Sequence, residues 1–323
     1  MPPLRRFLLD KLRIGVVGLP GKWSTETLAD AIETKTGFRL VIDMDDVSLD
    51  LATNSLNYQQ HNLCDLDAII IKKIGHHYSP NSLDRLELLR IAENSGVKVC
   101  SNPEKILRLI NRLSCTVTLR NANIPMPKTM ITEDITTAIE TVELYGEAIF
   151  KPLYSTKACG MCVISKKDGK AKIRKAVEAF KTDNKMMYIQ QKVALGGRDM
   201  GLMFLGGRYL GAYARVGKKD AWNTTINSGG SYAAAEPSDE IIAMATKAQN
   251  LFGMTYTTVD VAETENSAIV FEVSAFGGFR GGKEGLNLDV ATLYVEHVLT
   301  ALKSPKPTLV EPTILAQNRL MNA

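Results

Sequence analysis

Long hydrophobic runs are missing from this sequence of 323 residues. The longest, at residues 68–71, has the length of a buried strand, whereas a membrane-spanning helix needs roughly 18 to 20 apolar residues. A short apolar patch near the N-terminus is interrupted by Asp10 and Lys11 before it could form the core of a signal peptide. We therefore expect a cytoplasmic protein with no membrane partner.

Cysteine is also scarce, and its five residues form an odd and scattered set. Such a set argues against a disulfide framework and favours reduced thiols. Cys159 and Cys162 have the spacing of half a zinc site or of a redox pair, but the sequence holds no second pair. We therefore interpret them as thiols without a metal or redox role.

A strong excess of one charge sign is absent as well. The chain has 39 Lys and Arg against 35 Asp and Glu, and the net charge of +4 is spread along its length. Because no basic arm or stripe is present, nucleic acid is not an expected partner. The length predicts roughly two domains, at about 150 residues for each.

What is present in the first hundred residues is an alternation of β-branched runs and helix-compatible stretches. Strands are expected at residues 13–18, 39–43, 66–72 and 97–100, and helices at 25–36 and 83–94. This order predicts a parallel, doubly wound sheet. Gly37 is expected to end the first helix as its C′ cap.

The glycines near the first strand do not form a nucleotide-binding motif. Five residues separate Gly15 from Gly21, whereas a P-loop has about four between its glycines, and the dinucleotide fingerprint needs a Gly-x-Gly pair. We interpret residues 18–21 as a tight turn, with Ser24 or Thr25 capping the next helix.

The pattern changes to α+β after residue 101. An apolar face of helical period predicts one helix over 104–122. Further helices are expected at 135–145 and 171–181, and strands at 148–151, 161–165 and 187–190. The predicted domains are therefore an N-terminal α/β domain (1–101), a linker helix with a lid subdomain (102–190), a C-terminal subdomain (191–304) and a tail (305–323).

Two carboxylates stand out in the late segment, where apolar runs at 258–261 and 269–274 predict a hairpin. Asp260 and Glu272 each lie among apolar neighbours, and a buried carboxylate is costly unless a cation or a donor pairs with it. Adjacent strands could present both to Mg²⁺, together with substrate phosphates. The alternative is a pair of structural carboxylates bonded to Lys or Arg.

A second group of residues suits phosphate. Lys151 closes the predicted strand 148–151, and the small-residue loop 155–160 follows it. The ammonium group would supply charge, and the loop would supply backbone N–H groups.

Taken in order, these segments resemble the ATP-grasp superfamily, and within it the RimK-like branch of glutamate ligases and lysine-biosynthesis ligases. The resemblance covers about residues 102–301, two-thirds of the chain. The matching segments are 111–112, 124–129, 150–152, the loop ending at Gly160, 188–193, 197–199, 215–218, 222–230, 259–261, 271–274 and 277–280.

The resemblance implies an N-terminal doubly wound domain followed by an ATP-grasp fold of two α+β subdomains with ATP between them. The residues that it assigns to ATP are Arg112, Lys151, Ser155, Thr156, Gly160, Gln190, Gln191, Val193 and Asp199. Those that it assigns to Mg²⁺ (or Mn²⁺) are Asp260, Glu272 and Ser274. Arg215, Lys218 and Arg280 are the expected catalytic residues, because their charge would stabilise the phosphoryl group in transfer.

The implied activity is that of a carboxylate–amine ligase. A carboxylate attacks the γ-phosphate to give an acylphosphate and ADP, and an amine then displaces phosphate to leave an amide. The expected partners are a small-molecule or peptide carboxylate and an amine, and the resemblance is compatible with a homo-oligomer.

Several motif positions depart from the resembled family. Arg112 replaces a lysine, Ser274 an asparagine and Gly201 an arginine, while Asn223 and Thr225 replace an arginine and an asparagine. We therefore expect a substrate different from those of characterised members. Two alternatives stay open: a phosphotransferase acting on a hydroxyl, and a nucleotide-binding regulatory module that has lost catalysis.

Overall fold

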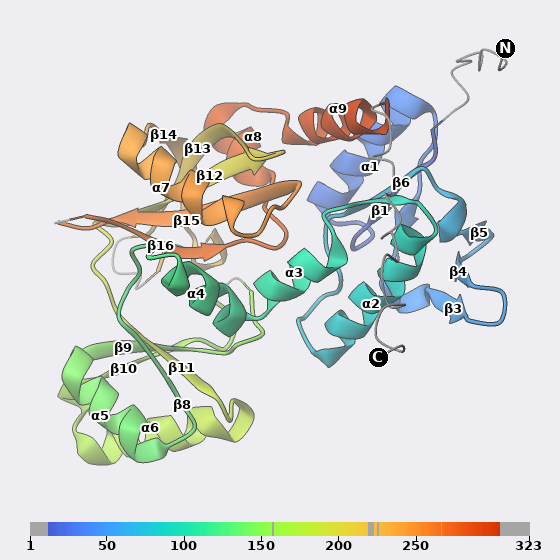
Figure 1. The fold of residues 1–323 in the computed structure, drawn as a ribbon. Coiled ribbons are helices and arrows are strands. Elements are labelled where there is room, and N and C mark those ends of the chain that lie inside the picture. Colours follow the sequence, from blue (N-terminus) through green and yellow to red (C-terminus); the bar gives the residue numbers. More distant parts are fainter. Residues whose placement is uncertain (1–11, 157, 219–222, 225, 266, 304–323) are drawn as a thin grey trace, which may run out of the picture.

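The computed structural model describes residues 12–156, 158–218, 223–224, 226–265 and 267–303. Trp222, Thr225 and the predicted tail 305–323 lie outside the described residues. Figure 1 shows the N-terminal sheet, the lid sheet and the C-terminal sheet with their helices, and α3 and α4 lie between them in the middle of the molecule. No helix in the described part of the chain combines the length and the apolar character needed to cross a membrane.

The N-terminal sheet is parallel, in the order β2-β1-β6-β7. Its strands are β1 (Ile14–Val17), β2 (Val41–Ile42), β6 (Ala68–Ile71) and β7 (Lys98–Cys100). Helix α1 (Trp23–Thr36) covers one face and α2 (Pro80–Asn94) the other, so β1 and β6 are buried along their whole length. The predicted doubly wound sheet is confirmed.

Two local features of this domain differ from expectation. The chain forms a small antiparallel sheet after β2 and before β6, which no pattern predicted. Its strands are β3 (Ser48–Asp50), β4 (Ser55–Tyr58) and β5 (His61–Asn62). The prediction that Ser24 or Thr25 caps α1 was wrong, because the helix begins one residue before Ser24 and Glu26 accepts the N–H of Gly21 at 2.6 Å. Gly37 ends α1 with φ +69°, as predicted.

The predicted single helix 104–122 was also wrong, because the chain forms two helices, α3 (Pro103–Ile110) and α4 (Arg112–Asn121). Asn111 separates them with an extended backbone (φ −81°, ψ 107°), and its side chain accepts the N–H groups of Leu113 at 3.0 Å and Ser114 at 3.4 Å. This N-cap starts α4 and places Arg112 in its first turn. Both helices share one hydrophobic core with the C-terminal sheet.

The lid has an antiparallel sheet of its own, in the order β10-β9-β11-β8. Its elements are β8 (Thr129–Thr132), α5 (Ile135–Tyr145), β9 (Glu147–Lys151), β10 (Cys162–Ser165), α6 (Lys170–Asp183) and β11 (Met187–Gln191). Phe150 and Ile189 point into the core that α5 and α6 cover. Because successive side chains alternate across a sheet, Lys151 and Gln190 lie on the opposite face.

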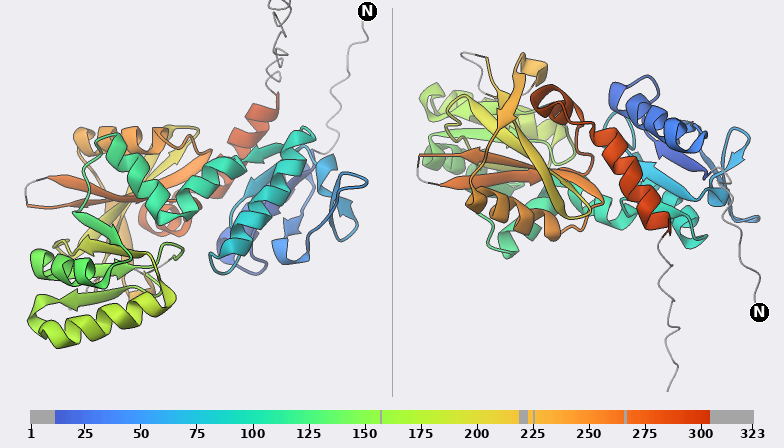
Figure 2. Two further views of the ribbon diagram at one scale, coloured as in Figure 1. Left: turned by 60° about the horizontal axis from the view of Figure 1, so that its bottom comes forward. Right: turned by 90° about the horizontal axis from the view of Figure 1, so that it is seen from above.

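The C-terminal sheet has the order β14-β13-β12-β15-β16. Its elements are β12 (Arg198–Leu205), β13 (Arg208–Val216), β14 (Ser231–Ala235), α7 (Asp239–Asn250), β15 (Tyr256–Glu263), β16 (Ala268–Val273), α8 (Arg280–Leu286) and α9 (Val290–Lys303). Helix α9 returns to the N-terminal domain and packs on α1 (Figures 1 and 2), where Lys35 pairs with Glu296 at 2.7 Å. The last helix thus links the two halves of the chain.

Candidate active site

The two carboxylates predicted from the hairpin lie directly opposite each other, Asp260 on β15 and Glu272 on β16. Asp260 Oδ2 is 3.0 Å from the Arg215 guanidinium, whereas Oδ1 is buried and has no hydrogen-bond partner among the described residues. Burial raises the pKa of Asp260 to about 7, against the opposing effect of Arg215. A buried acceptor left without a donor costs about 1–3 kcal/mol, so Oδ1 is a position that a cation would stabilise.

Glu272 is linked to the lid through Arg112. Arg112 Nη1 lies 3.2 Å from Glu272 Oε2, and the same side chain, 10% exposed, also donates to the Pro152 carbonyl at 3.1 Å and to Ser155 Oγ at 3.2 Å. The break at Asn111 therefore places a guanidinium between the lid and the acid pair. Each of the two acids has one arginine partner, as the structural alternative required, but Asp260 keeps a buried oxygen for a further ligand.

Lys151 occupies the lid face that points to this pair. Its Nζ donates to Gln190 Oε1 at 2.6 Å and lies 5.5 Å from the ring centroid of Phe271, the residue before Glu272. Gln190 is almost fully buried, and its amide nitrogen is 3.2 Å from Thr129 Oγ1 and 3.3 Å from the Tyr188 hydroxyl. Burial lowers the pKa of Lys151 to about 7, and the charge of Arg112 adds to that effect.

Asp199 and Arg215 complete the cluster from β12 and β13. The Asp199 carboxylate accepts hydrogen bonds from Arg215, with Nε at 3.1 Å, and from Thr224 Oγ1 at 2.5 Å. Although burial opposes the charge of Arg215, Asp260 and Asp199 together raise its pKa well above the ordinary value. Thr224 lies in the matching segment 222–230 but was not predicted as a site residue, because a hydroxyl bonded to an acid 25 positions away leaves no local pattern.

Five other predicted residues lie in loops or at the end of a strand. Thr156 and Gly160 belong to the loop after β9, where a Cβ on Gly160 would lie 3.0 Å from the Pro152 ring. Gln191 ends β11, Val193 follows it, and Lys218 packs against Gly229.

Two predicted residues make no contact with the acid pair in the interactions of the described chain. The Ser274 backbone N–H donates to Thr258 O at 2.8 Å. Arg280 lies 5.5 Å from the Trp23 ring and 3.8 Å from Glu284. Arg280 therefore faces the N-terminal domain.

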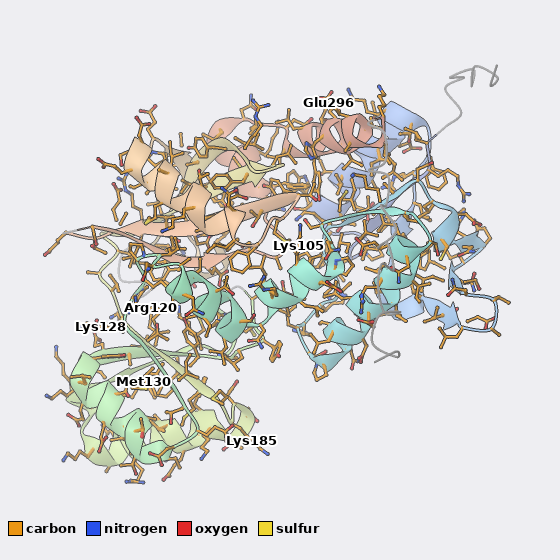
Figure 3. All side chains as sticks on the ribbon, in the orientation of Figure 1. Lys105, Arg120, Lys128, Met130, Lys185 and Glu296 are labelled. Carbon is orange, nitrogen blue, oxygen red and sulfur yellow. The ribbon has the colours of Figure 1, made fainter. Side chains whose placement is uncertain are left out.

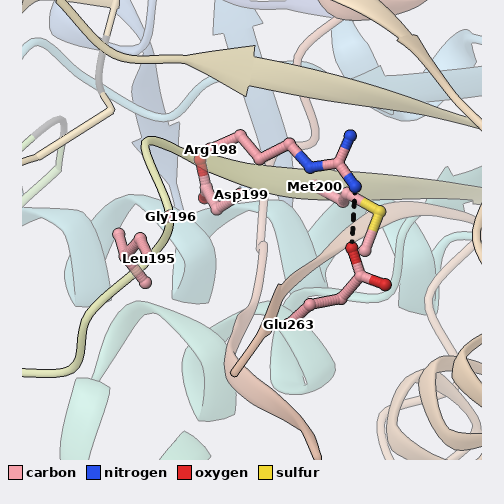
Figure 4. Close-up of a pocket in the computed structure, with 6 residues that line it drawn as sticks. All are labelled: Leu195, Gly196, Arg198, Asp199, Met200 and Glu263. Carbon is pink, nitrogen blue, oxygen red and sulfur yellow. Dashed lines mark hydrogen bonds and ion pairs between the residues drawn. The ribbon is translucent and has the colours of Figure 1, made fainter. Parts of the chain in front are cut away.

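A cavity of about 180 Å³ opens beside the cluster (Figure 4). Arg198 and Glu263, joined at 3.0 Å, form its polar wall. It is lined by Leu195, Gly196, Arg198, Asp199, Met200 and Glu263. Asp199 is the one predicted site residue among them, so this cavity borders the cluster and is separate from Lys151 and Glu272.

The donors present suit magnesium better than zinc. Within the described residues, no group of three or more His, Cys, Asp or Glu side chains could hold a metal ion. Two carboxylates with phosphate oxygens are a usual ligand set for Mg²⁺, and Asp260 Oδ1 is free to join one. The site therefore fits a divalent ion that arrives with a nucleotide.

A lid sheet facing a five-stranded sheet with paired carboxylates, behind a doubly wound domain, defines an ATP-grasp protein. Residues 110–298 match the family model of the RimK-like ATP-grasp domain, and the chain belongs to that family. The predicted family, fold and class of enzyme, an ATP-grasp ligase, are thereby confirmed.

Relatives and solved structures agree with this assignment. The tetrahydromethanopterin:alpha-L-glutamate ligase of Methanosarcina acetivorans is 26% identical over 79% of this chain and 83% of its own length. The ATP-grasp ligase PsnB, in complex with a phosphomimetic variant of its minimal precursor, Mg and ADP, superposes with a TM-score of 0.71 at 19% identity, over 91% of this chain and 99% of PsnB. A RimK domain protein of Sphaerobacter thermophilus superposes with a TM-score of 0.67 at 17% identity, over 89% of this chain and 99% of that protein's chain.

The glycine that departs from the family at position 201 has a structural partner. Gly201 lies opposite Tyr213 on the neighbouring strand, and a Cβ at Gly201 would be 2.4 Å from the tyrosine ring. A Cβ on Gly281 would meet the same ring at 2.5 Å. Tyr213 therefore fills the space that a side chain at position 201 would need.

We predict that Gly201→Ala destabilises the protein by about 1–3 kcal/mol, because the added methyl group overpacks the Tyr213 ring. Tyr213→Ala lowers the free energy of unfolding because it leaves a cavity. The double variant should lose less free energy of unfolding than the two single variants lose together. Urea denaturation of the four proteins measures this coupling. Strictly additive effects would show that the ring does not exclude a side chain at position 201.

We predict that the Lys151 amine takes up a proton when a nucleotide binds. At pH 8 an amine with a pKa of about 7 is mostly neutral, and a bound phosphate would restore its charge, so uptake should approach one proton. Calorimetry of ADP binding in HEPES and in Tris, without divalent ions, measures this uptake from the difference in enthalpy. Lys151→Arg, which stays charged, is the control and should abolish the difference; equal enthalpies in the wild type would contradict the prediction.

Proposed function

We propose that this protein is an ATP- and Mg²⁺-dependent carboxylate–amine ligase. It activates a carboxylate as an acylphosphate, releases ADP and phosphate, and forms an amide bond. The observation that carries the proposal is the convergence of Lys151, Arg112 and Arg215 on the pair Asp260 and Glu272. Three cations around two acids with a free buried oxygen suit a metal–triphosphate group.

Each residue then has a defined task. Lys151 would give up its hydrogen bond to Gln190 and donate to a phosphate oxygen instead. Arg112, in the first turn of α4, would bind a second phosphate. Asp260 and Glu272 would hold Mg²⁺, which neutralises phosphate charge when bound. Arg215, held by Asp199, would stabilise the transferring phosphoryl group without reorganisation of its own side chain.

The remaining predicted residues would complete the nucleotide site. Gln191 and Val193, at and after the end of β11, would contact adenine through backbone groups. Ser155, Thr156 and Gly160 would close over the phosphates. These assignments follow the family resemblance and the position of the loop next to Arg112.

For the amine we propose L-glutamate. Curated relatives from several organisms are named as alpha-L-glutamate ligases, which supports an amino acid as the second substrate. The acid is a small-molecule or peptide carboxylate, and tetrahydromethanopterin, the substrate named in the Methanosarcina acetivorans relative, is the first candidate. Gly201 and Asn223, which replace family arginines, support an acid pocket of changed chemistry.

The direct test measures ADP release and the transfer of carboxylate oxygen to phosphate. Purified protein is given ATP, Mg²⁺, L-glutamate and a panel of ¹⁸O-labelled carboxylic acids, including tetrahydromethanopterin and short peptides. We expect ADP release only with a matching acid, and transfer of one ¹⁸O atom per turnover from the acid to phosphate. Release of AMP, a stable phosphorylated hydroxyl compound, or nucleotide binding without turnover in a cell extract would each contradict ligase activity.

Glu272→Gln tests the metal assignment. The amide keeps the size of the side chain but loses the charge, so we expect kcat to fall by at least about 100-fold and the melting temperature to change by less than about 3 °C. The matched control is Glu263→Gln on the same hairpin, where the carboxylate pairs with Arg198 at the surface; its kcat should stay within about twofold. An undiminished rate in Glu272→Gln would show that Glu272 does not hold the metal.

A further inference from the structure

Lys72 is a buried lysine whose side chain reaches from the N-terminal domain to the C-terminal half. It follows β6 at the carboxyl end of the central strands, and the residue is 7% exposed. Its Nζ donates to the Gly277 carbonyl at 2.7 Å and lies 4.4 Å from the centroid of the Phe279 ring. No carboxylate pairs with it in the described part of the chain.

The partners of Lys72 belong to one segment, residues 277–280, which comprises the end of the connection that follows β16 and the first residue of helix α8. The same segment is held from the other side, because the Tyr256 hydroxyl donates to the Gly278 carbonyl at 3.1 Å. A Cβ on Gly277 would lie 2.7 Å from the Tyr256 ring, so the backbone approaches it closely. Two glycines would leave this segment free to move if these contacts were absent.

Arg280 ends the segment and makes the second contact with the N-terminal domain. Its guanidinium lies 5.5 Å from the Trp23 ring centroid. Its side chain is 56% exposed, so it remains open to a ligand. Lys72 and Trp23 therefore hold two ends of one short segment, whose last residue is an accessible cation.

Stability alone does not account for a lysine at this place. Burial lowers its pKa to about 7, and the charge of Lys73 adds to this effect, so the charged form is held at a cost. An apolar side chain of the same length would fill the space without that cost. The lysine supplies what an apolar side chain does not, a donor for the Gly277 carbonyl and an amino group over the Phe279 ring.

We propose that Lys72 is a positioning residue, which fixes the segment 277–280 so that Arg280 is presented to an anionic acceptor. The part concerning the acceptor rests on the proposed ligase function. The part concerning the segment does not, because it can be measured in the protein without substrate. Arg280 would then select the acid by its charge, and it would not act on the phosphoryl group.

The position of the segment can be followed through Trp23. The sequence contains two tryptophans, so a Trp222→Phe background leaves Trp23 as the one emitter. Lys72→Met keeps an unbranched side chain that is shorter by the terminal nitrogen, and it removes the donor and the charge. We expect a red shift of the emission and an increase of about twofold in acrylamide quenching, because a released Arg280 no longer covers the ring.

Lys105→Met is the matched control. Lys105, labelled in Figure 3, also donates to a backbone carbonyl across the chain, Gly253 O at 3.1 Å, but it is exposed and far in sequence from residues 277–280. Its removal should leave the emission unchanged. Lys72→Gln is a second variant in case Lys72→Met does not fold; it keeps an N–H donor, and its quenching should lie between the wild type and Lys72→Met.

Kinetics test the link to the acceptor. With the acid and L-glutamate that support turnover, Lys72→Met should raise KM for the acid about tenfold and leave kcat and KM for ATP within about twofold. Arg280→Met should do the same, and the double variant should be no worse than either single one. Unchanged Trp23 emission in both Lys72 variants would overturn the positioning role, and additive effects on KM would overturn the role through Arg280. Absence of any turnover with an altered emission would instead count against the proposed function.

Discussion

The site depends on two carboxylates that face each other across β15 and β16, the largely buried Asp260 and the partly exposed Glu272. Asp260 and Glu272 repel each other, and each needs a cation in the absence of a ligand. Arg215 and Arg112 supply these charges from two different parts of the chain. The acid pair thus connects the C-terminal sheet to the lid, and one buried oxygen stays free for what binds there.

One backbone feature makes this connection. If the helix ran unbroken over residues 104–122, Arg112 would lie in its middle, and its backbone N–H would bond to the carbonyl of residue 108 within the helix. The N-cap of Asn111 restarts the helix, and the Arg112 backbone and side chain then reach the Leu153 and Pro152 carbonyls of the lid. A local hydrogen-bonding choice therefore decides which cation meets Glu272.

The sequence allowed the prediction of features that arise from local periodicity. The parallel strands, the hairpin with its opposed acids, and the cap at Gly37 were all expected, and the structure contains them. The helix break was missed because apolar positions keep their period on both sides of Asn111. Contacts between distant residues, such as Thr224 with Asp199, lie beyond any local pattern. The roles of the site residues stay predictions.

The departures from the family divide by location. Residues assigned to the phosphates keep their charge: Lys151 is present, and Arg112 replaces one cation by another. The losses of family side chains lie elsewhere. Ser274 replaces an asparagine assigned to the metal, and Gly201 and Asn223 replace arginines, with Tyr213 occupying the space beside Gly201. We propose that Arg280, which is exposed and lies beside Trp23 of the N-terminal domain, supplies the cation that meets the acid in place of a lost family arginine. Charge is thus kept at the positions assigned to the phosphates and lost at positions 201 and 223, and this difference is the basis on which we propose a pocket of changed chemistry for the acid.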